Sequence, residues 1–277
     1  MLRHRRPSLF ALGAASGVAA GLVLVIAFLT RLGARVDERV YEAIGQAGAQ
    51  APRPRIENVA VLADPLPFVL TALALAGIAL LRGRIVLAAL VPVILLAASA
   101  TTQALQEAVP RLLERADPGG YQLAWPSGHA TAAMSLALCG VLVASPRSRP
   151  VAAMLGAGYA VAVGYAQIAL GSHLPSDVLG GYLLAASFVL SGVAVLKLLE
   201  GDHARVPARF GTPVVAPVIG ALVVIGAATA TVFLKGSDPL ALAQQAPALA
   251  AGASIAALGV ILIAALGVAL GVSERAS

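Results

Sequence analysis

Long apolar runs constrain the fold of this chain more than any other feature of its sequence. Several stretches of Ala, Val, Leu, Gly and Ile reach the roughly 20 residues needed to cross the hydrocarbon core of a bilayer. Such runs cover residues 9–30, 58–81, 85–105, 128–145, 151–171, 176–196, 213–234 and 249–272. Because backbone polar groups in lipid must be satisfied within the segment, each run is predicted to be a helix. The sequence therefore predicts an all-α, polytopic membrane helix bundle.

The composition supports a chain whose main partner is the lipid bilayer. Charged residues are 12% of the 277 residues, about half the share of an ordinary soluble domain. The net charge of +6 does not indicate nucleic-acid binding, because the basic residues lie at the ends of the apolar runs and form no single patch. The first run follows a basic start but is longer than the apolar part of a signal peptide, so we expect a retained helix.

The basic residues also predict an orientation. With the amino end inside, the short segments predicted to be cytoplasmic carry Arg3, Arg5, Arg6, Arg82, Arg84, Arg147, Arg149, Lys197, Arg205, Arg209 and Arg275. Lys and Arg are enriched in cytoplasmic loops of membrane proteins. We therefore expect a plasma membrane protein with both termini in the cytoplasm. The Ala- and Arg-rich composition favours a bacterial cell membrane.

Two further patterns concern helix packing. Gly13, Gly17 and Gly21 form a stripe of small residues that lets a neighbouring helix approach closely. Both packing within the bundle and a homodimer face are open interpretations of this stripe. In the loop at 31–57, apolar residues at helix-like spacing predict an interfacial amphipathic helix that could also cover a site. The single cysteine, Cys139, excludes an internal disulfide.

Two histidines begin apolar runs on the side predicted to be external. His129 follows Trp125-Pro126-Ser127-Gly128, in which Pro fits a first helical turn and Ser can cap the helix. The free N–H groups of such a turn can bind an anion such as phosphate. A helix-start histidine bonded to a backbone carbonyl is the alternative interpretation.

The second histidine, His173, lies four residues before Asp177. That spacing puts the two side chains on one face of a helical turn. A carboxylate there can hold the proton on one ring nitrogen and leave the other nitrogen as a nucleophile. Asp177 could instead be a first-turn acid that interacts with the helix dipole.

Together these residues resemble a known family. Pro126-Ser127-Gly128-His129, followed by His173-x-x-x-Asp177 and its continuation to Tyr182, is similar to the second and third signature motifs of the type 2 phosphatidic acid phosphatase family. That family includes membrane lipid phosphate phosphatases, polyprenyl diphosphate phosphatases and vanadium haloperoxidases. The resemblance covers roughly residues 58–197, and the first helix completes a six-helix core. We therefore expect this core over 1–200, with two additional transmembrane helices and a short cytoplasmic tail over 201–277.

The resemblance implies a metal-independent phosphohydrolase without a cofactor, acting on a membrane lipid phosphate or diphosphate at the extracytoplasmic face. His173 would attack phosphorus and form a phosphohistidine, with Asp177 orienting it. His129 would protonate the leaving oxygen and then help to activate water. Ser127 and the backbone of Gly128 would hold phosphate oxygens.

The sequence departs from the family at the cations that usually bind phosphate. Gln106 and Leu113 stand where the first motif has Lys and Arg, and Ala166 and Gln167 stand where the third motif has Ser-Arg. Gln106 and Gln167 could hydrogen-bond a phosphate, and Arg111 and Arg115 could reach the site from the loop. Two alternatives stay open: a weakened or inactive family member that binds a lipid headgroup or regulates a partner, and a transporter-like or scaffold bundle.

Overall fold

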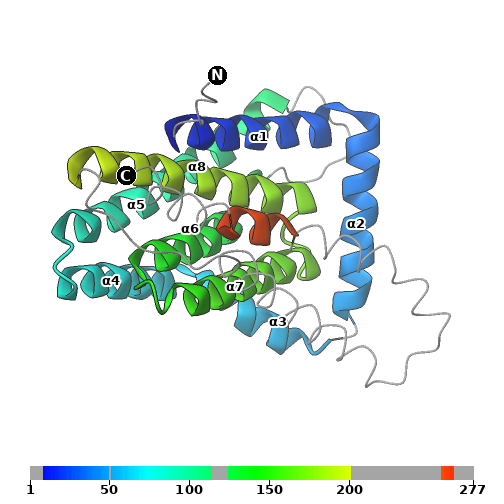
Figure 1. The fold of residues 1–277 in the computed structure, drawn as a ribbon. Coiled ribbons are helices and arrows are strands. Elements are labelled where there is room, and N and C mark those ends of the chain that lie inside the picture. Colours follow the sequence, from blue (N-terminus) through cyan, green and yellow to red (C-terminus); the bar gives the residue numbers. More distant parts are fainter. Residues whose placement is uncertain (1–8, 50, 114–123, 201–256, 265–277) are drawn as a thin grey trace, which may run out of the picture.

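The computed structural model describes residues 9–49, 51–113, 124–200 and 257–264. These ranges are helical and contain no strand. The elements are α1 (Leu9–Leu29), α2 (Arg31–Ala49), α3 (Arg53–Ala60), the 3-10 helix η1 (Val61–Ala63), α4 (Pro65–Leu81), α5 (Ile85–Leu113), α6 (Gly128–Val143), α7 (Arg149–Ala169) and α8 (Pro175–Glu200). A further helical segment covers 257–264. The predicted all-α bundle is confirmed (Figure 1).

Four described helices are long and apolar enough to cross a membrane. They are Leu9–Leu29, Ile85–Pro110, Arg149–Ala169 and Pro175–Glu200. The bent pair Arg53–Ala63 and Pro65–Leu81 would make a fifth span, and α6 is a shorter apolar helix. Each of the first six predicted runs therefore coincides with helix. The run at 213–234 lies outside the described residues, and only 257–264 of the last run is described.

The second predicted run is not one continuous helix, which corrects the sequence prediction. It bends by 47° between Ala63 and Pro65. The proline ring disfavours helical backbone at the residue before it, and Asp64 is extended, with φ −63° and ψ 161°. The break leaves a polar residue, Asp64, at the point where α4 begins.

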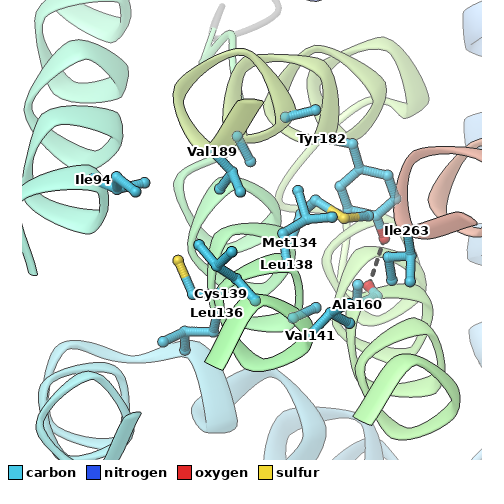
Figure 2. Close-up of a cluster of buried hydrophobic side chains, with 14 of the residues drawn as sticks. Ile94, Met134, Leu136, Leu138, Cys139, Val141, Ala160, Tyr182, Val189 and Ile263 are labelled. Atoms are coloured by element: carbon cyan, nitrogen blue, oxygen red, sulfur yellow. Dashed lines mark hydrogen bonds between the residues drawn. The ribbon is translucent and has the colours of Figure 1, made fainter. Parts of the chain in front are cut away.

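The α6 helix lies at the centre of the bundle. Twelve of its 16 residues are buried, so α6 is enclosed by its neighbours on nearly every side. Figure 2 shows Met134 and Leu138 of α6 beside Tyr182 of α8, whose hydroxyl donates a hydrogen bond to the carbonyl of Ala160 in α7. Ile263 of the segment 257–264 packs into the same cluster. Part of the last predicted run therefore contacts the core.

The first helix packs along α8, and the glycine stripe takes part in this contact. The Ser16 hydroxyl donates a hydrogen bond of 2.7 Å to the carbonyl of Leu183. Gly13 and Gly17 lie against serine residues of α8, where a Cβ atom would come within 2.6 and 3.2 Å of a hydroxyl oxygen. These two glycines therefore serve packing within the bundle. Gly21 has open space around its Cα.

The predicted amphipathic helix in the first loop is confirmed as α2. It stands across one end of the bundle, at a steep angle to the long helices (Figure 1). Ile44 is fully buried, and Gly48 lies so close to Ala169 of α7 that a Cβ atom would come within 2.8 Å of the alanine Cβ. Its position at the membrane interface stays a prediction.

The opposite end of the bundle gathers residues predicted to be cytoplasmic. Arg84 forms an ion pair of 2.8 Å with Glu200, which joins the start of α5 to the end of α8. Arg82 donates a hydrogen bond to the carbonyl of Val143 at the end of α6. Both candidate histidines lie at the other end, where α2 and α3 also carry arginines next to the acids Glu38, Glu42 and Glu57.

Candidate active site

A cavity of about 680 Å³ opens between α4, α5, the start of α6 and the turn between α7 and α8. His129 and His173, predicted from separate motifs, both line it. The other lining residues are Ala63, Pro65, Phe68, Val69, Leu96, Ser99, Thr102, Gln103, Gln106, Ala124, Gly128, Ala132 and Ser172. The fold therefore brings the two histidines to one cavity.

His129 is positioned by the first turn of α6. Ser127 is the N-cap of this helix, and its hydroxyl accepts a hydrogen bond of 3.4 Å from the N–H of Ala130. Pro126 precedes the cap and lies outside the first helical turn, which corrects the prediction for that residue. Ser127 is fully buried and is not a lining residue, whereas Gly128 does line the cavity.

His173 lies in the turn before α8. Its Nδ1 is 3.3 Å from Oδ2 of Asp177, which also accepts a hydrogen bond of 2.9 Å from the N–H of Leu174. The helix begins at Pro175, so the pair forms across the helix start and not along a continuous helical face. Asp177 is 3% exposed. This arrangement leaves Nε2 of His173 without a bond to the carboxylate.

The starts of α6 and α8 are joined directly. The N–H of Ser127 donates a hydrogen bond of 2.9 Å to the carbonyl of Asp177. Gly181, one turn further along α8, lies against this junction, because a Cβ atom there would come within 2.8 Å of the Ser127 carbonyl oxygen and 2.9 Å of the Thr131 hydroxyl. Only a residue without a side chain fits this approach, so Gly181 sets the spacing of the two histidine-bearing segments.

The α5 wall of the cavity is polar but uncharged. Ser99, Thr102, Gln103 and Gln106 line the cavity at helical spacing. Gln106 donates a hydrogen bond of 2.8 Å to the carbonyl of Pro126. No lysine or arginine is present among the lining residues of the described part of the chain.

Besides Ser127, three further residues that were predicted to bind substrate either do not line the cavity or have side chains outside the described residues. Gln167 is 3% exposed inside α7 and is not a lining residue. Its carbonyl accepts hydrogen bonds from the N–H groups of Ser172 and His173, at 3.0 and 3.3 Å, so it shapes the turn. Arg111 lies within α5, but its side chain and the whole of Arg115 fall outside the described residues.

Sequence reasoning missed Asp64, whose Oδ1 is 2.9 Å from Nε2 of His129. A signal was present in the sequence. Asp64 is an ionisable residue inside an apolar run predicted to span the membrane, and such residues are functional candidates by default.

Sequence reasoning also missed Asp37, on the buried face of α2. Its carboxylate accepts hydrogen bonds from the N–H and the hydroxyl of Ser176, the former at 2.9 Å. Burial raises the pKa of Asp37 to about 6; the negative charge of Asp177 adds to this increase, and the two hydrogen bonds from Ser176 oppose it. The sequence did contain a signal, because Asp37 is an acidic residue on the apolar face of the predicted amphipathic helix.

A second contact from α2 reaches the same turn. The hydroxyl of Tyr41, one helical turn after Asp37, donates a hydrogen bond of 3.2 Å to the carbonyl of Gly171. Gly171 has φ +78°, a conformation that favours glycine. The α2 helix therefore supports the His173 turn at both of its ends.

The apolar helices and their arrangement define a multi-pass membrane protein. The sequence profile of the PAP2 superfamily matches residues 14–199, and the chain belongs to that superfamily. The fold is similar to the crystal structure of a transmembrane PAP2-type phosphatidylglycerolphosphate phosphatase from Bacillus subtilis. The match has a TM-score of 0.50 and 20% sequence identity, and it covers 69% of this chain and 99% of that chain. A comparison with curated protein sequences finds no match.

Proposed function

We propose that this protein is a metal-independent phosphohydrolase that acts on a membrane lipid phosphate or diphosphate. The observation that carries the proposal is the hydrogen-bonded pair of His173 and Asp177 on the same cavity as His129. Membership of the PAP2 superfamily supports phosphoryl transfer as the reaction.

In the first step, the lone pair on Nε2 of His173 attacks phosphorus. A P–N bond forms, the P–O bond to the lipid breaks, and the leaving oxygen takes a proton from His129. Asp177 holds the proton on Nδ1 and balances the positive charge of the ring. In the second step, water gives a proton to His129 and attacks phosphorus, the P–N bond breaks, and phosphate leaves.

Lipid is the substrate class that the surroundings favour. Phe68 and Val69 of α4, with Leu96 of α5, add apolar lining to the polar residues of α5 and the histidines. An apolar wall suits the chain of a lipid, and the polar residues suit its headgroup. The basic segments at the opposite end of the bundle support an extracytoplasmic site, and we propose a plasma membrane location on the same basis.

The lack of cations among the described lining residues favours a second candidate function. Removal of one preorganised donor to the developing charge typically costs about 3–4 kcal/mol of barrier, and several family cations are unmatched here. A family member that binds a lipid headgroup, or regulates a partner, without turnover would need no such cations. Retention of His129, His173 and Asp177 supports the enzyme over this alternative.

The test is phosphate release by purified protein in detergent. The panel contains undecaprenyl diphosphate, phosphatidate and phosphatidylglycerophosphate, each assayed with a chelator and with His173→Ala as the control. The proposal expects chelator-resistant release from at least one lipid and no release by the variant. Headgroup binding by a folded protein without any release would support the second candidate instead.

A further inference from the structure

His129 has a carboxylate partner of its own. Nε2 of His129 is 2.9 Å from Oδ1 of Asp64, a residue that lies 65 positions earlier in the chain. We propose that Asp64 is a positioning residue for His129, which fixes the ring so that Nδ1 is the atom that exchanges protons with the substrate. This inference rests on the proposed hydrolase function and deepens it.

The backbone around Asp64 is held from several directions. Its N–H donates a hydrogen bond of 3.0 Å to the Val61 carbonyl, and its own carbonyl accepts one of 2.9 Å from Phe68. The hydroxyl of Tyr159 in α7 donates a hydrogen bond of 3.0 Å to the Leu62 carbonyl, which fixes the 3-10 turn against the bundle. The neighbours on both sides, Ala63 and Pro65, line the cavity. The break between η1 and α4 therefore holds Asp64 at the cavity edge.

The carboxylate is directed to the histidine and not to its own helix. Asp64 occupies the N-cap position of α4, where an Asp side chain ordinarily accepts a hydrogen bond from the second or third N–H of the helix. Asp64 makes no such capping bond. Its oxygen contacts the imidazole of His129 instead.

The contact decides which ring nitrogen reacts. A carboxylate can only accept, so neutral His129 carries its proton on Nε2 and keeps a lone pair on Nδ1. Within the described residues, Nδ1 has no hydrogen-bond partner. In the first step the protonated ring would donate its Nδ1 proton to the leaving oxygen; in the second, Nδ1 would accept a proton from water.

The two histidines then have opposite assignments. Asp177 lies on Nδ1 of His173 and leaves Nε2 to attack phosphorus, whereas Asp64 lies on Nε2 of His129 and leaves Nδ1 for the proton. The two carboxylate pairs thereby give two chemically identical rings different roles at one cavity.

The first test compares two substrates. A lipid phosphate has a poor leaving group that needs a proton, whereas 4-nitrophenyl phosphate has a good one that does not. We expect Asp64→Ala to lower kcat for the lipid at least 10-fold. For the aryl ester, the rate constant of the first phosphoryl transfer, measured as a pre-steady-state burst, should change less than 3-fold. Asp64→Glu keeps a carboxylate that can only accept and should recover part of the loss, whereas the amide of Asp64→Asn can also donate to Nε2 and should not. Glu57→Gln, which removes an exposed acid of α3, is the matched control and should change neither rate.

The substitutions at Asp64 are not expected to unfold the protein, so a lower rate can be assigned to the site. The side chains of His129 and Asp64 are 36% and 43% exposed, and ion pairs with that much solvent contribute little to stability. Parallel losses on both substrates, or no loss on either, would overturn the positioning role. Wild-type protein that hydrolyses neither substrate would instead count against the proposed function.

The second test does not depend on turnover. Long-range ¹H–¹⁵N spectra of protein labelled at histidine distinguish the two neutral tautomers, and His129→Gln assigns the signal. The wild-type protein and Asp64→Glu should show His129 protonated at Nε2, and Asp64→Ala should lose this preference. An unchanged tautomer in Asp64→Ala would overturn the inference even if the protein is an active phosphatase.

Discussion

Replacement of Asp37 by Asn should remove a defined part of the pH dependence of stability. Asp37 is 8% exposed, and burial raises its pKa from 3.8 to about 6. The folded protein therefore binds a proton more tightly at this site than the unfolded chain does. A carboxyl group with a raised folded-state pKa stabilises the fold below pH 4, and this contribution is lost as the pH rises through about 6.

The size of the effect follows from the two pKa values. A pKa difference of about 2 corresponds to about 3 kcal/mol in full, most of which develops between pH 8 and pH 4. Protonation does not break the contact with Ser176, because the new O–H can donate to the serine hydroxyl oxygen. Asn has no titrating group, so Asp37→Asn should lack this gain on acidification.

The assay is equilibrium unfolding by sodium dodecyl sulfate in mixed micelles at pH 4 and pH 8. Titrating groups that do not interact with Asp37 contribute alike to both proteins, so only the difference between wild type and Asp37→Asn is read. Glu38→Gln, an exposed neighbour on α2, is the control and should follow the wild type. The reasoning is refuted if wild type and Asp37→Asn gain the same free energy of unfolding between pH 8 and pH 4.

Two further predictions concern packing and charge. Gly181→Ala should lower the free energy of unfolding by about 1–3 kcal/mol and reduce kcat, because the added methyl group meets backbone and hydroxyl oxygens of α6; Gly140→Ala, which has open space, should be neutral or stabilise by up to about 1 kcal/mol. Equal effects in thermal unfolding would contradict the packing argument. Gln106→Lys should raise kcat/KM for a lipid phosphate about 3- to 10-fold, and Gln106→Glu should lower it by a similar factor, because the side chain lines the cavity. Changes in the same direction for both variants would indicate that geometry, and not charge, controls this position.

The sequence was sufficient for features that depend on local pattern. Apolar length predicted the positions of α1, α4, α5, α6, α7 and α8, because crossing a bilayer requires a minimum number of apolar residues. Ser127 was predicted as the cap of α6, and the four-residue spacing of His173 and Asp177 predicted their contact. In both of these contacts the interacting residues lie within four positions along the chain.

The features that were missed depend on contacts between distant segments. Asp37 and Ser176 are 139 residues apart in the chain, and Asp64 and His129 are 65 apart. No spacing rule connects residues at such separations, so both carboxylates could be recognised only as acids in unusual positions. The break at Pro65 was missed for a different reason, because the high average hydropathy of the run concealed the single residue that ends the helix. Gln167 failed to reach the cavity because its helical face points into the bundle.

The central claim is that His173 carries phosphate during turnover, and trapping that intermediate tests it most directly. His129→Ala should react once with 4-nitrophenyl phosphate and then accumulate the intermediate, because the base that activates water is missing. After an alkaline quench, which preserves phosphohistidine, peptide mass spectrometry should find one phosphate on His173 and none in the His173→Ala variant. Release of nitrophenol without a phosphate on His173, or with phosphate on another residue, would contradict the account.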